Sequence, residues 1–210
     1  MTAPTGAARG RPRQFDRDQA LLQAMHIFWE RGFEGTSLAD LSSALGLTAT
    51  SIYAAFGSKQ ALFREAVELY VSSDGNATWR ALETSGTTRQ AIEAMLRGTV
   101  DAFCNADTPR GCLMLLADKG LGRGNDSVKA FLQQWRAKTR EQLRARLQRG
   151  VDAGELPVGT DAAAMASIVV VFLNGISIET ADGVSQQDLL KAVDVFLSSW
   201  PWSDVPVKGG

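Results

Sequence analysis

Residues 36–63 read TSLADLSSALGLTATSIYAAFGSKQALF, a stretch that predicts two short helices joined by a tight turn and followed at once by a third. In the first helix, leucines recur at helical spacing from Leu38 to Leu45, so one face is apolar and packs against a core. Gly46 ends this helix, because glycine readily takes the left-handed conformation that closes a helix end. Thr48 is a suitable N-cap for the second helix.

The second short helix, predicted at about residues 49–55, turns few side chains inward. Only Ile52 and Phe56 lie on the core side, at i, i+4 spacing. The outer face carries small side chains, hydroxyls and one phenol: Ala49, Thr50, Ser51, Tyr53 and Ala54. The second helix of a helix-turn-helix presents such a face to the major groove of DNA. On this pattern alone, an ordinary antiparallel helix pair in an all-α core is an equal alternative.

The helix pair lies within a longer ordered pattern of residues. The pattern comprises Gly32-Phe33 and Gly35-Thr36-Ser37 before the pair, Leu45-Gly46-Leu47 at the turn, Ile52-Tyr53 and Phe56 in the second helix, and Ser58-Lys59 with Leu62-Phe63 after it. It resembles the DNA-binding signature of the TetR family of transcriptional regulators. The resemblance is strong from Phe15 to Leu69, and elsewhere it rests on helical content and chain length.

The resemblance implies an all-α protein with two parts. The first is an N-terminal three-helix helix-turn-helix DNA-binding domain, and the second is a C-terminal helical domain for ligand binding and dimerisation. We expect a disordered basic arm at residues 1–14, the DNA-binding domain at 15–60, the effector-binding and dimerisation domain at 61–204, and a flexible tail at 205–210.

DNA contacts follow from the resemblance residue by residue. Tyr53 and Lys59 match family positions that grip phosphates, whereas Thr50 and Ser51 face the bases. Arginines of the basic arm can lie in a narrow minor groove, although the arm alone reads as a solubilising tail. The predicted DNA-binding residues are Arg11, Arg13, Thr36, Thr48, Ala49, Thr50, Ser51, Tyr53 and Lys59.

Alanines stand at positions 49, 54 and 55, where the family more often has bulkier polar or aromatic residues. Direct base readout is therefore expected to be thin. DNA shape and the arginine arm are expected to carry more of the sequence preference.

The composition is that of an ordinary globular chain, with 210 residues, 45% of them hydrophobic and 21% charged. A formal net charge of -1 argues against wholesale coating of nucleic acid, so DNA contacts must come from local placement of charge. Two cysteines and no secretory signal indicate a reducing cytoplasm. Residues 162–178 are uncharged but short for a membrane span and lack a basic flank, so we expect a buried or subunit-facing helix and no membrane.

Large, adaptable side chains are spread over the C-terminal helices: Trp79, Met95, Phe103, Met114, Phe131, Trp135 and Phe172. Any one of them alone reads as ordinary core. Because TetR-like proteins commonly bind a small effector in this region, the resemblance places a pocket here for an apolar or aromatic molecule. Asp101, Arg110 and Asp118 are the nearest candidates for its polar groups.

The last two predicted helices are candidates for a subunit interface, since apolar side chains occupy more than one of their faces. By resemblance they form a four-helix bundle with the partner of a homodimer. The predicted interface residues are Val169, Val170, Leu173, Val193, Phe196 and Leu197. Such a dimer places two recognition helices about 34–36 Å apart, so its double-stranded DNA operator is an inverted repeat.

The sequence offers no arrangement typical of an enzyme. It has one histidine, no phosphate-binding loop of the Walker type and no dinucleotide-binding glycine motif, and we expect no metal and no cofactor. We therefore predict a regulator, a repressor rather than an activator, that a small-molecule effector releases from a palindromic operator. The alternatives are a helical ligand-binding or interaction module without DNA function, and a thiol-sensing regulator that uses Cys104 and Cys112.

Overall fold

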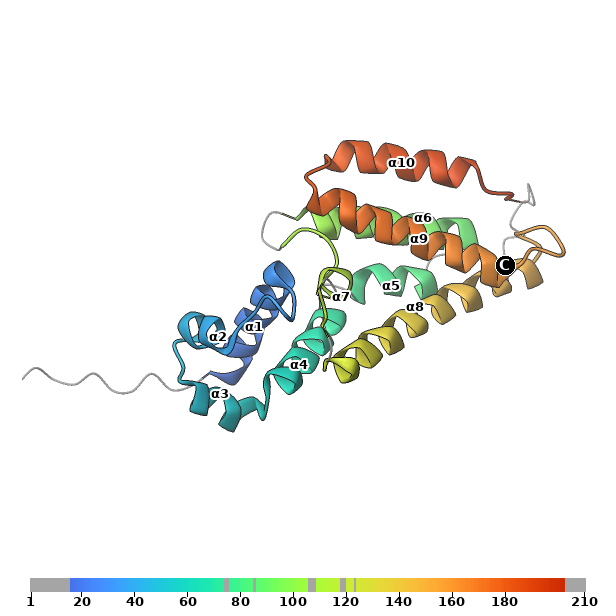
Figure 1. Cartoon of the computed structure of the whole chain (residues 1–210). Helices are drawn as coiled ribbons and strands as arrows, with labels where there is room; N and C mark the ends of the chain where they lie inside the picture. The colour runs from blue at the N-terminus through green and yellow to red at the C-terminus, as the bar shows by residue number, and fades with distance from the viewer. Residues whose placement is uncertain are drawn as a thin grey trace, which may run out of the picture.

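A computed structural model of the chain describes residues 16–73, 76–84, 86–105, 109–117, 120–122 and 124–202. These residues form ten helices and no strand, which confirms the all-α prediction (Figure 1). The helices are α1 (Arg17–Arg31), α2 (Leu38–Leu45), α3 (Ala49–Phe56), α4 (Lys59–Ser72), α5 (Asn76–Thr84), α6 (Thr88–Cys104), α7 (Leu113–Leu116), α8 (Asp126–Asp152), α9 (Ala162–Ala181) and α10 (Gln186–Ser198).

Helices α1 to α4 gather around an aromatic core at one end of the molecule (Figure 1). The Phe63 ring meets Phe28 and Phe33 edge-on, with 5.1 Å between ring centroids in each pair. All three rings are buried. Edge-to-face packing of this kind adds to the apolar burial and fixes how α1 and α4 cross.

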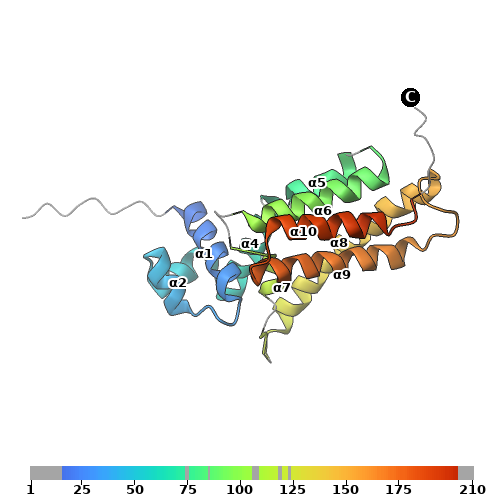
Figure 2. The ribbon, with the colours of Figure 1, turned by 90° about the horizontal axis from the view of Figure 1, so that it is seen from above.

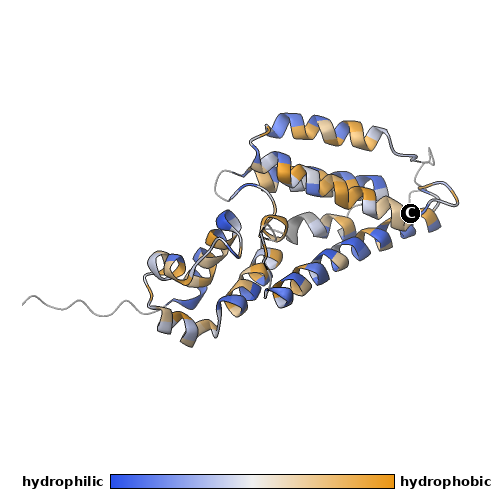
Figure 3. Cartoon of the chain, viewed as in Figure 1, coloured by the Kyte–Doolittle hydropathy of each residue, from blue (hydrophilic) through white to orange (hydrophobic). Residues whose placement is uncertain are grey.

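Helices α5, α6, α8, α9 and α10 form the second group; seen from above, α5, α6, α9 and α10 run in similar directions and α8 crosses them obliquely (Figure 2). Their shared core is mainly aliphatic, with Leu96, Leu143 and Val169 fully buried. Helix α9 is hydrophobic along most of its length (Figure 3). By length and composition α9 would be able to cross a membrane, but it packs instead on α8 and α6 in this core.

The two groups meet where α7 and the preceding turn lie against α1. The Trp29 indole N–H donates to the Gly111 carbonyl at 3.0 Å, and this bond is buried. The Cys112 amide donates to the Ser177 hydroxyl of α9 at 2.7 Å. Tyr70 of α4 meets Trp29 edge-on at 4.8 Å between centroids. One turn of chain is thus bonded to both groups of helices.

Two features of the fold differ from the sequence prediction. The spacing of Leu113, Met114 and Leu116 predicts a helix at residues 109–119, but the structure has only α7, because Gly111 has a φ of 85° and breaks the helical path. Helix α5 was not predicted, and it forms where Leu82 is buried against the core of the second group. The predicted boundary at residue 60 stays a prediction, and the buried residues of α4 belong to the N-terminal core.

Candidate nucleic-acid interface and ligand pocket

The turn between α2 and α3 is fixed by local hydrogen bonds. The Ser37 hydroxyl accepts from the Asp40 amide at 3.1 Å, and the Asp40 carboxylate accepts from the Ser37 amide at 2.8 Å, so α2 begins in a capping box. Hydrogen bonds from Ser37 also hold the pKa of Asp40 below its usual value. Gly46 closes α2 with a φ of 64°, in the left-handed conformation that the sequence predicted.

Helix α3 is anchored by two side chains and presents the rest outward. Ile52 is fully buried and Phe56 nearly so. The Thr48 hydroxyl accepts from the Ser51 amide at 3.1 Å and caps the helix. At the outer end of the first group, α3 lies far from α9 and α10 (Figure 1). The outward residues Ala49, Thr50, Ser51 and Tyr53 are exposed.

Arg17 positions α3 from outside the predicted set of site residues. Its guanidinium forms a two-pronged contact with Glu65 of α4, at 2.9 and 2.7 Å, and lies 4.6 Å from the centroid of the Phe56 ring. It also donates to the carbonyl of Ala55 at 3.4 Å. The C-terminal end of α3 is therefore held against α1 and α4. Because these partners are far apart in the sequence, spacing gave no signal for them.

Lys59 is the first residue of α4. Its ammonium lies 4.3 Å from the centroid of the Phe33 ring, so part of the side chain is covered. This burial lowers the pKa of Lys59, while the nearby carboxylates of Glu34 and Asp40 raise it. The cation is thereby held near the first turn of α4, instead of extending freely into solvent.

Three members of the predicted DNA-binding set need separate comment. Thr36 is fully buried, and its hydroxyl donates to the Gly32 carbonyl at 2.8 Å, where it closes the end of α1. A side chain enclosed in this way has no surface to offer DNA, so we remove Thr36 from the set. Arg11 and Arg13 lie outside the described residues.

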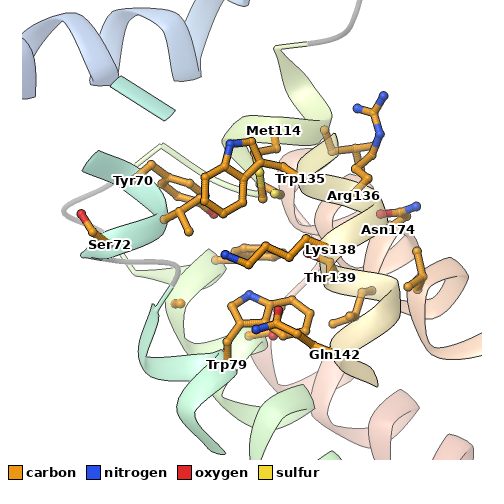
Figure 4. A pocket seen from close by; sticks show the side chains of 18 of the residues that line it. Tyr70, Ser72, Trp79, Met114, Trp135, Arg136, Lys138, Thr139, Gln142 and Asn174 are labelled. Carbon is orange, nitrogen blue, oxygen red and sulfur yellow. The ribbon is translucent and has the colours of Figure 1, made fainter. Parts of the chain in front are cut away.

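A cavity of about 340 Å³ opens between α4, α5, α6, α7, α8 and α9 (Figure 4). Four of the seven residues predicted for a pocket line it: Trp79, Phe103, Met114 and Trp135. The other three lie elsewhere. Met95 is fully buried in the core, Phe131 packs under the guanidinium of Arg64 at 5.1 Å, and Phe172 stacks on Phe196 at 4.2 Å.

The polar groups of the pocket are not the ones predicted. Asp101 is exposed and accepts from Gln186 at 2.8 Å, Arg110 is exposed away from the cavity, and Asp118 is outside the described residues. The polar lining comes mainly from residues that sequence reasoning missed: Ser72, Thr99, Arg136, Lys138, Thr139, Gln142 and Asn174. On α8, lining residues stand at positions 135, 138, 139 and 142. This helical spacing puts them on one face of α8, and it was the signal in the sequence that could have identified them.

The two cysteines are free thiols at the ends of the chain segment that joins α6 to α7. Cys112 lies in the pocket wall, and burial raises the pKa of its thiol, an effect only partly offset by Tyr70 and the charge of Arg136. A raised pKa keeps the thiol protonated and lowers its reactivity. This geometry does not favour the thiol-sensing alternative at Cys112.

The predicted dimer residues lie mostly inside the chain's own core. Val169, Val170, Leu173, Val193 and Leu197 are buried, and Phe196 is half-buried. The same two helices expose other apolar side chains, with Ile168 53%, Val171 70% and Val195 69% accessible. An interface on these helices would therefore use their outward residues, because the buried ones already contact the rest of the chain.

Comparison with known proteins gives matches along nearly the whole chain. The family model "Bacterial regulatory proteins, tetR family" matches residues 20–66, and "Tetracyclin repressor-like, C-terminal domain" matches residues 88–181. The HTH-type transcriptional repressor ComR of Escherichia coli (strain K12) is 32% identical over 92% of this chain and 93% of its own length. An uncharacterized HTH-type transcriptional regulator of Bacillus subtilis (strain 168), YezE, is 31% identical over 90% of this chain and 98% of its own.

Among solved structures, the chain is similar to a cysteine mutant of the TetR family transcriptional regulator CifR, complexed with 26bp double-strand operator DNA. The identity is 38%, the TM-score is 0.86, and the match covers 91% of this chain and 100% of the other. The similarity therefore includes both the helix-turn-helix and the helices that surround the pocket.

Proposed function

Because the chain belongs to the TetR family and is a DNA-binding transcriptional regulator, we propose that it is a repressor that binds an inverted-repeat operator as a homodimer. An effector that enters the cavity releases it from the DNA. The observation that carries this proposal is the outward presentation of Thr50, Ser51 and Tyr53 on a helix anchored by Ile52 and Phe56. ComR, to which the chain is similar over most of its length, is a transcriptional repressor.

The contacts with DNA divide into two kinds. Tyr53 on α3 and Lys59 at the start of α4 supply a phenol and a cation for phosphates, with the Thr48 hydroxyl as a further donor. Thr50 and Ser51, which are exposed on α3, face the bases. A threonine contributes both a hydroxyl and a methyl group, and the methyl group suits contact with thymine.

The homodimer interface is proposed on the outward stripe of α9 and α10. On α9, Ala164, Ile168, Val171 and Gly175 are exposed at a spacing that keeps them on one face. No atom lies within 4 Å of the position that a Cβ on Gly175 would take, so another helix can approach closely there. On α10, Val195 is a further exposed apolar side chain.

Coupling between the pocket and DNA is proposed to pass through Tyr70 and Trp29. Tyr70 lines the cavity and also packs edge-on against Trp29 of α1. An effector that fits a conformation with a displaced Tyr70 would draw the dimer away from the spacing that DNA requires. Coupling of this kind is typically about 1–3 kcal/mol, and it acts equally in both directions.

Operator binding is tested by fluorescence anisotropy with DNA from the chain's own upstream intergenic region. The full chain should bind one inverted repeat with an affinity that falls steeply as salt rises. A helical ligand-binding or interaction module without DNA function, the rival reading, would show no sequence-selective binding.

The dimer is tested by light scattering on two matched variants. Val171→Asp places a charge in the proposed interface and should yield monomers with much weaker operator binding. Val158→Asp changes an equally apolar residue, 98% exposed between α8 and α9, and should leave a dimer. Monomers from both variants, or dimers from both, would argue against this interface.

We also propose that the protein acts in the cytoplasm, where its DNA partner lies, and has no enzymatic activity. The support is its membership in a family of transcriptional regulators. Turnover of a compound that binds the pocket would count against the second part of this proposal.

A further inference from the structure

In the cavity, a lysine of α8 lies close to two aromatic rings, one on α8 and one on α5. The Lys138 ammonium lies 4.9 Å from the centroid of the Trp135 ring. In Figure 4 the lysine side chain runs between Trp135 and Trp79, which belong to α8 and α5. The lysine thus lies between two indole rings of the cavity.

The charges around the cavity are predominantly positive. Two basic residues, Arg136 and Lys138, line it, against one acidic residue, Glu68, which is exposed on α4. Among the described residues, no carboxylate forms an ion pair with Lys138. The charge of Arg136 also acts on the Cys112 thiol in the cavity wall, where it lowers the pKa of that thiol against the larger effect of burial.

Further donors line the cavity. In Figure 4, Thr139 and Gln142 of α8 lie near Lys138, whereas Asn174 of α9 lies near Arg136. None of these three side chains takes part in a hydrogen bond within the described parts of the chain. Hydroxyl and amide groups can therefore turn their N–H or O–H toward an incoming acceptor.

We propose that the effector is an amphipathic anion, with a flat aromatic or alkyl body between Trp135 and Trp79 and a carboxylate paired with Lys138. This inference rests on the effector site proposed above and specifies its ligand class. Lys138 is exposed, so its flexible stem can turn outward to admit the body of the ligand and then pair with the carboxylate at the opening.

A cationic effector fits this cavity less well. A ligand cation would have to displace the Lys138 ammonium from the face of Trp135, and the displaced ammonium at the opening would still repel it. A neutral effector would gain the ring contacts but would leave the lysine without a counter-charge. The expected order of affinity is therefore anion, then neutral, then cation.

The test uses two sets of matched probes with the full chain: 2-naphthoate, 2-naphthamide and 2-naphthylmethylamine, and octanoate, octanamide and octylamine. Binding is measured by calorimetry. The acid of at least one set should bind about two- to fivefold more tightly than its amide, since an exposed ion pair contributes modestly. Lys138→Gln should remove this difference. The control Lys129→Gln alters a lysine of the same helix outside the cavity and should retain it.

Several outcomes overturn the inference: equal affinity for acid and amide, tighter binding of the amine, a preference that survives Lys138→Gln, or no binding by either acid into the millimolar range. Operator release is recorded separately by anisotropy. An acid that binds through Lys138 without releasing DNA supports the ligand class and contradicts the proposed coupling. If the protein does not bind operator DNA, the proposed function is wrong. The probe affinities still test the ligand class in that case.

Discussion

The outer face of α3 and the cavity between α4 and α9 differ in how the chain builds them. The α3 face comes from consecutive residues of one short helix, fixed by Ile52 below and by the Thr48 cap at its start. The cavity takes its walls from six helices, with Tyr70 and Asn174 more than a hundred residues apart in the sequence. A surface of local residues can be located from sequence, whereas a cavity between distant helices needs the fold.

The largest difference between the two regions is expected when a buried side chain that supports only one of them is removed. Ile52→Ala leaves a void under α3 and should cost about 2–5 kcal/mol of stability, concentrated in the N-terminal group. Operator binding should be lost while binding of naphthoate or octanoate in the cavity persists. Anisotropy and calorimetry on the same sample measure the two.

Met95→Ala is the matched control, because Met95 is equally buried in the second core. It should weaken binding in the cavity more than it weakens binding to the operator. If both variants impair both activities to the same extent, the two regions are not separable in the way that their construction suggests.

The next largest effect is expected at the junction, the contact of Trp29 with Gly111 where the two groups of helices meet. Trp29→Phe keeps an aromatic ring beside Tyr70 but leaves the buried Gly111 carbonyl without its donor, at a cost of about 1–3 kcal/mol. Operator binding and ligand binding should each remain, while release of DNA by ligand weakens. The measurement is the shift in operator affinity at saturating ligand.

Trp202→Phe provides the control for this variant, because the Trp202 indole donates to the Leu197 carbonyl at 2.8 Å, away from the contact between the two groups. It should leave the ligand-induced shift unchanged. An unchanged shift in Trp29→Phe as well would rule out the path through Tyr70 and Trp29.

A smaller effect is expected within the α3 face. Thr50→Ala should change the preference at particular base pairs by about 1 kcal/mol, the contribution of one ordinary hydrogen bond. Binding to a set of operators with single base-pair changes measures this preference. Thr50→Ser keeps the hydroxyl and removes the methyl, so it separates the two contributions. Uniform weakening over the whole operator set would contradict base readout by Thr50.

The smallest expected change at a single salt concentration is that of Lys59→Ala. Loss of one phosphate contact should weaken binding to all sequences and reduce the slope of log affinity against log salt by about one. Lys129→Ala, on α8, is the control and should leave the slope unchanged. A sequence-selective loss with an unaltered slope would show that Lys59 does not contact a phosphate.

The N-terminal motif was predictable because its signals are local. Gly46 closes α2, Thr48 caps α3, and the spacing of Ile52 and Phe56 orients the outer face, all within one short stretch. The burial of Thr36 was missed because its hydroxyl donates to the Gly32 carbonyl, and this carbonyl is available only because α1 ends at Arg31.

The C-terminal site was only partly predictable. Large side chains such as Trp79 and Trp135 were predicted for a pocket and line the cavity, but helical periodicity does not tell which of two apolar faces points to the chain's own core. Val169 and Val171 illustrate this, since they are two positions apart on α9 and one is buried while the other is exposed. The role of Lys138 was missed because a lysine on a charged helix ordinarily reads as part of a solvated surface.

Gly111 limits how this regulator can diversify. A Cβ there would lie 2.7 Å from the Ser177 carbonyl oxygen, and the φ of 85° already disfavours any other residue. The junction therefore has no room for adjustment by substitution at this position. Under the proposed function, a change of effector specificity would therefore arise in the walls of the cavity, at positions such as Gln142 or Asn174, where a new side chain changes the ligand contacts and leaves the contact between the two groups intact.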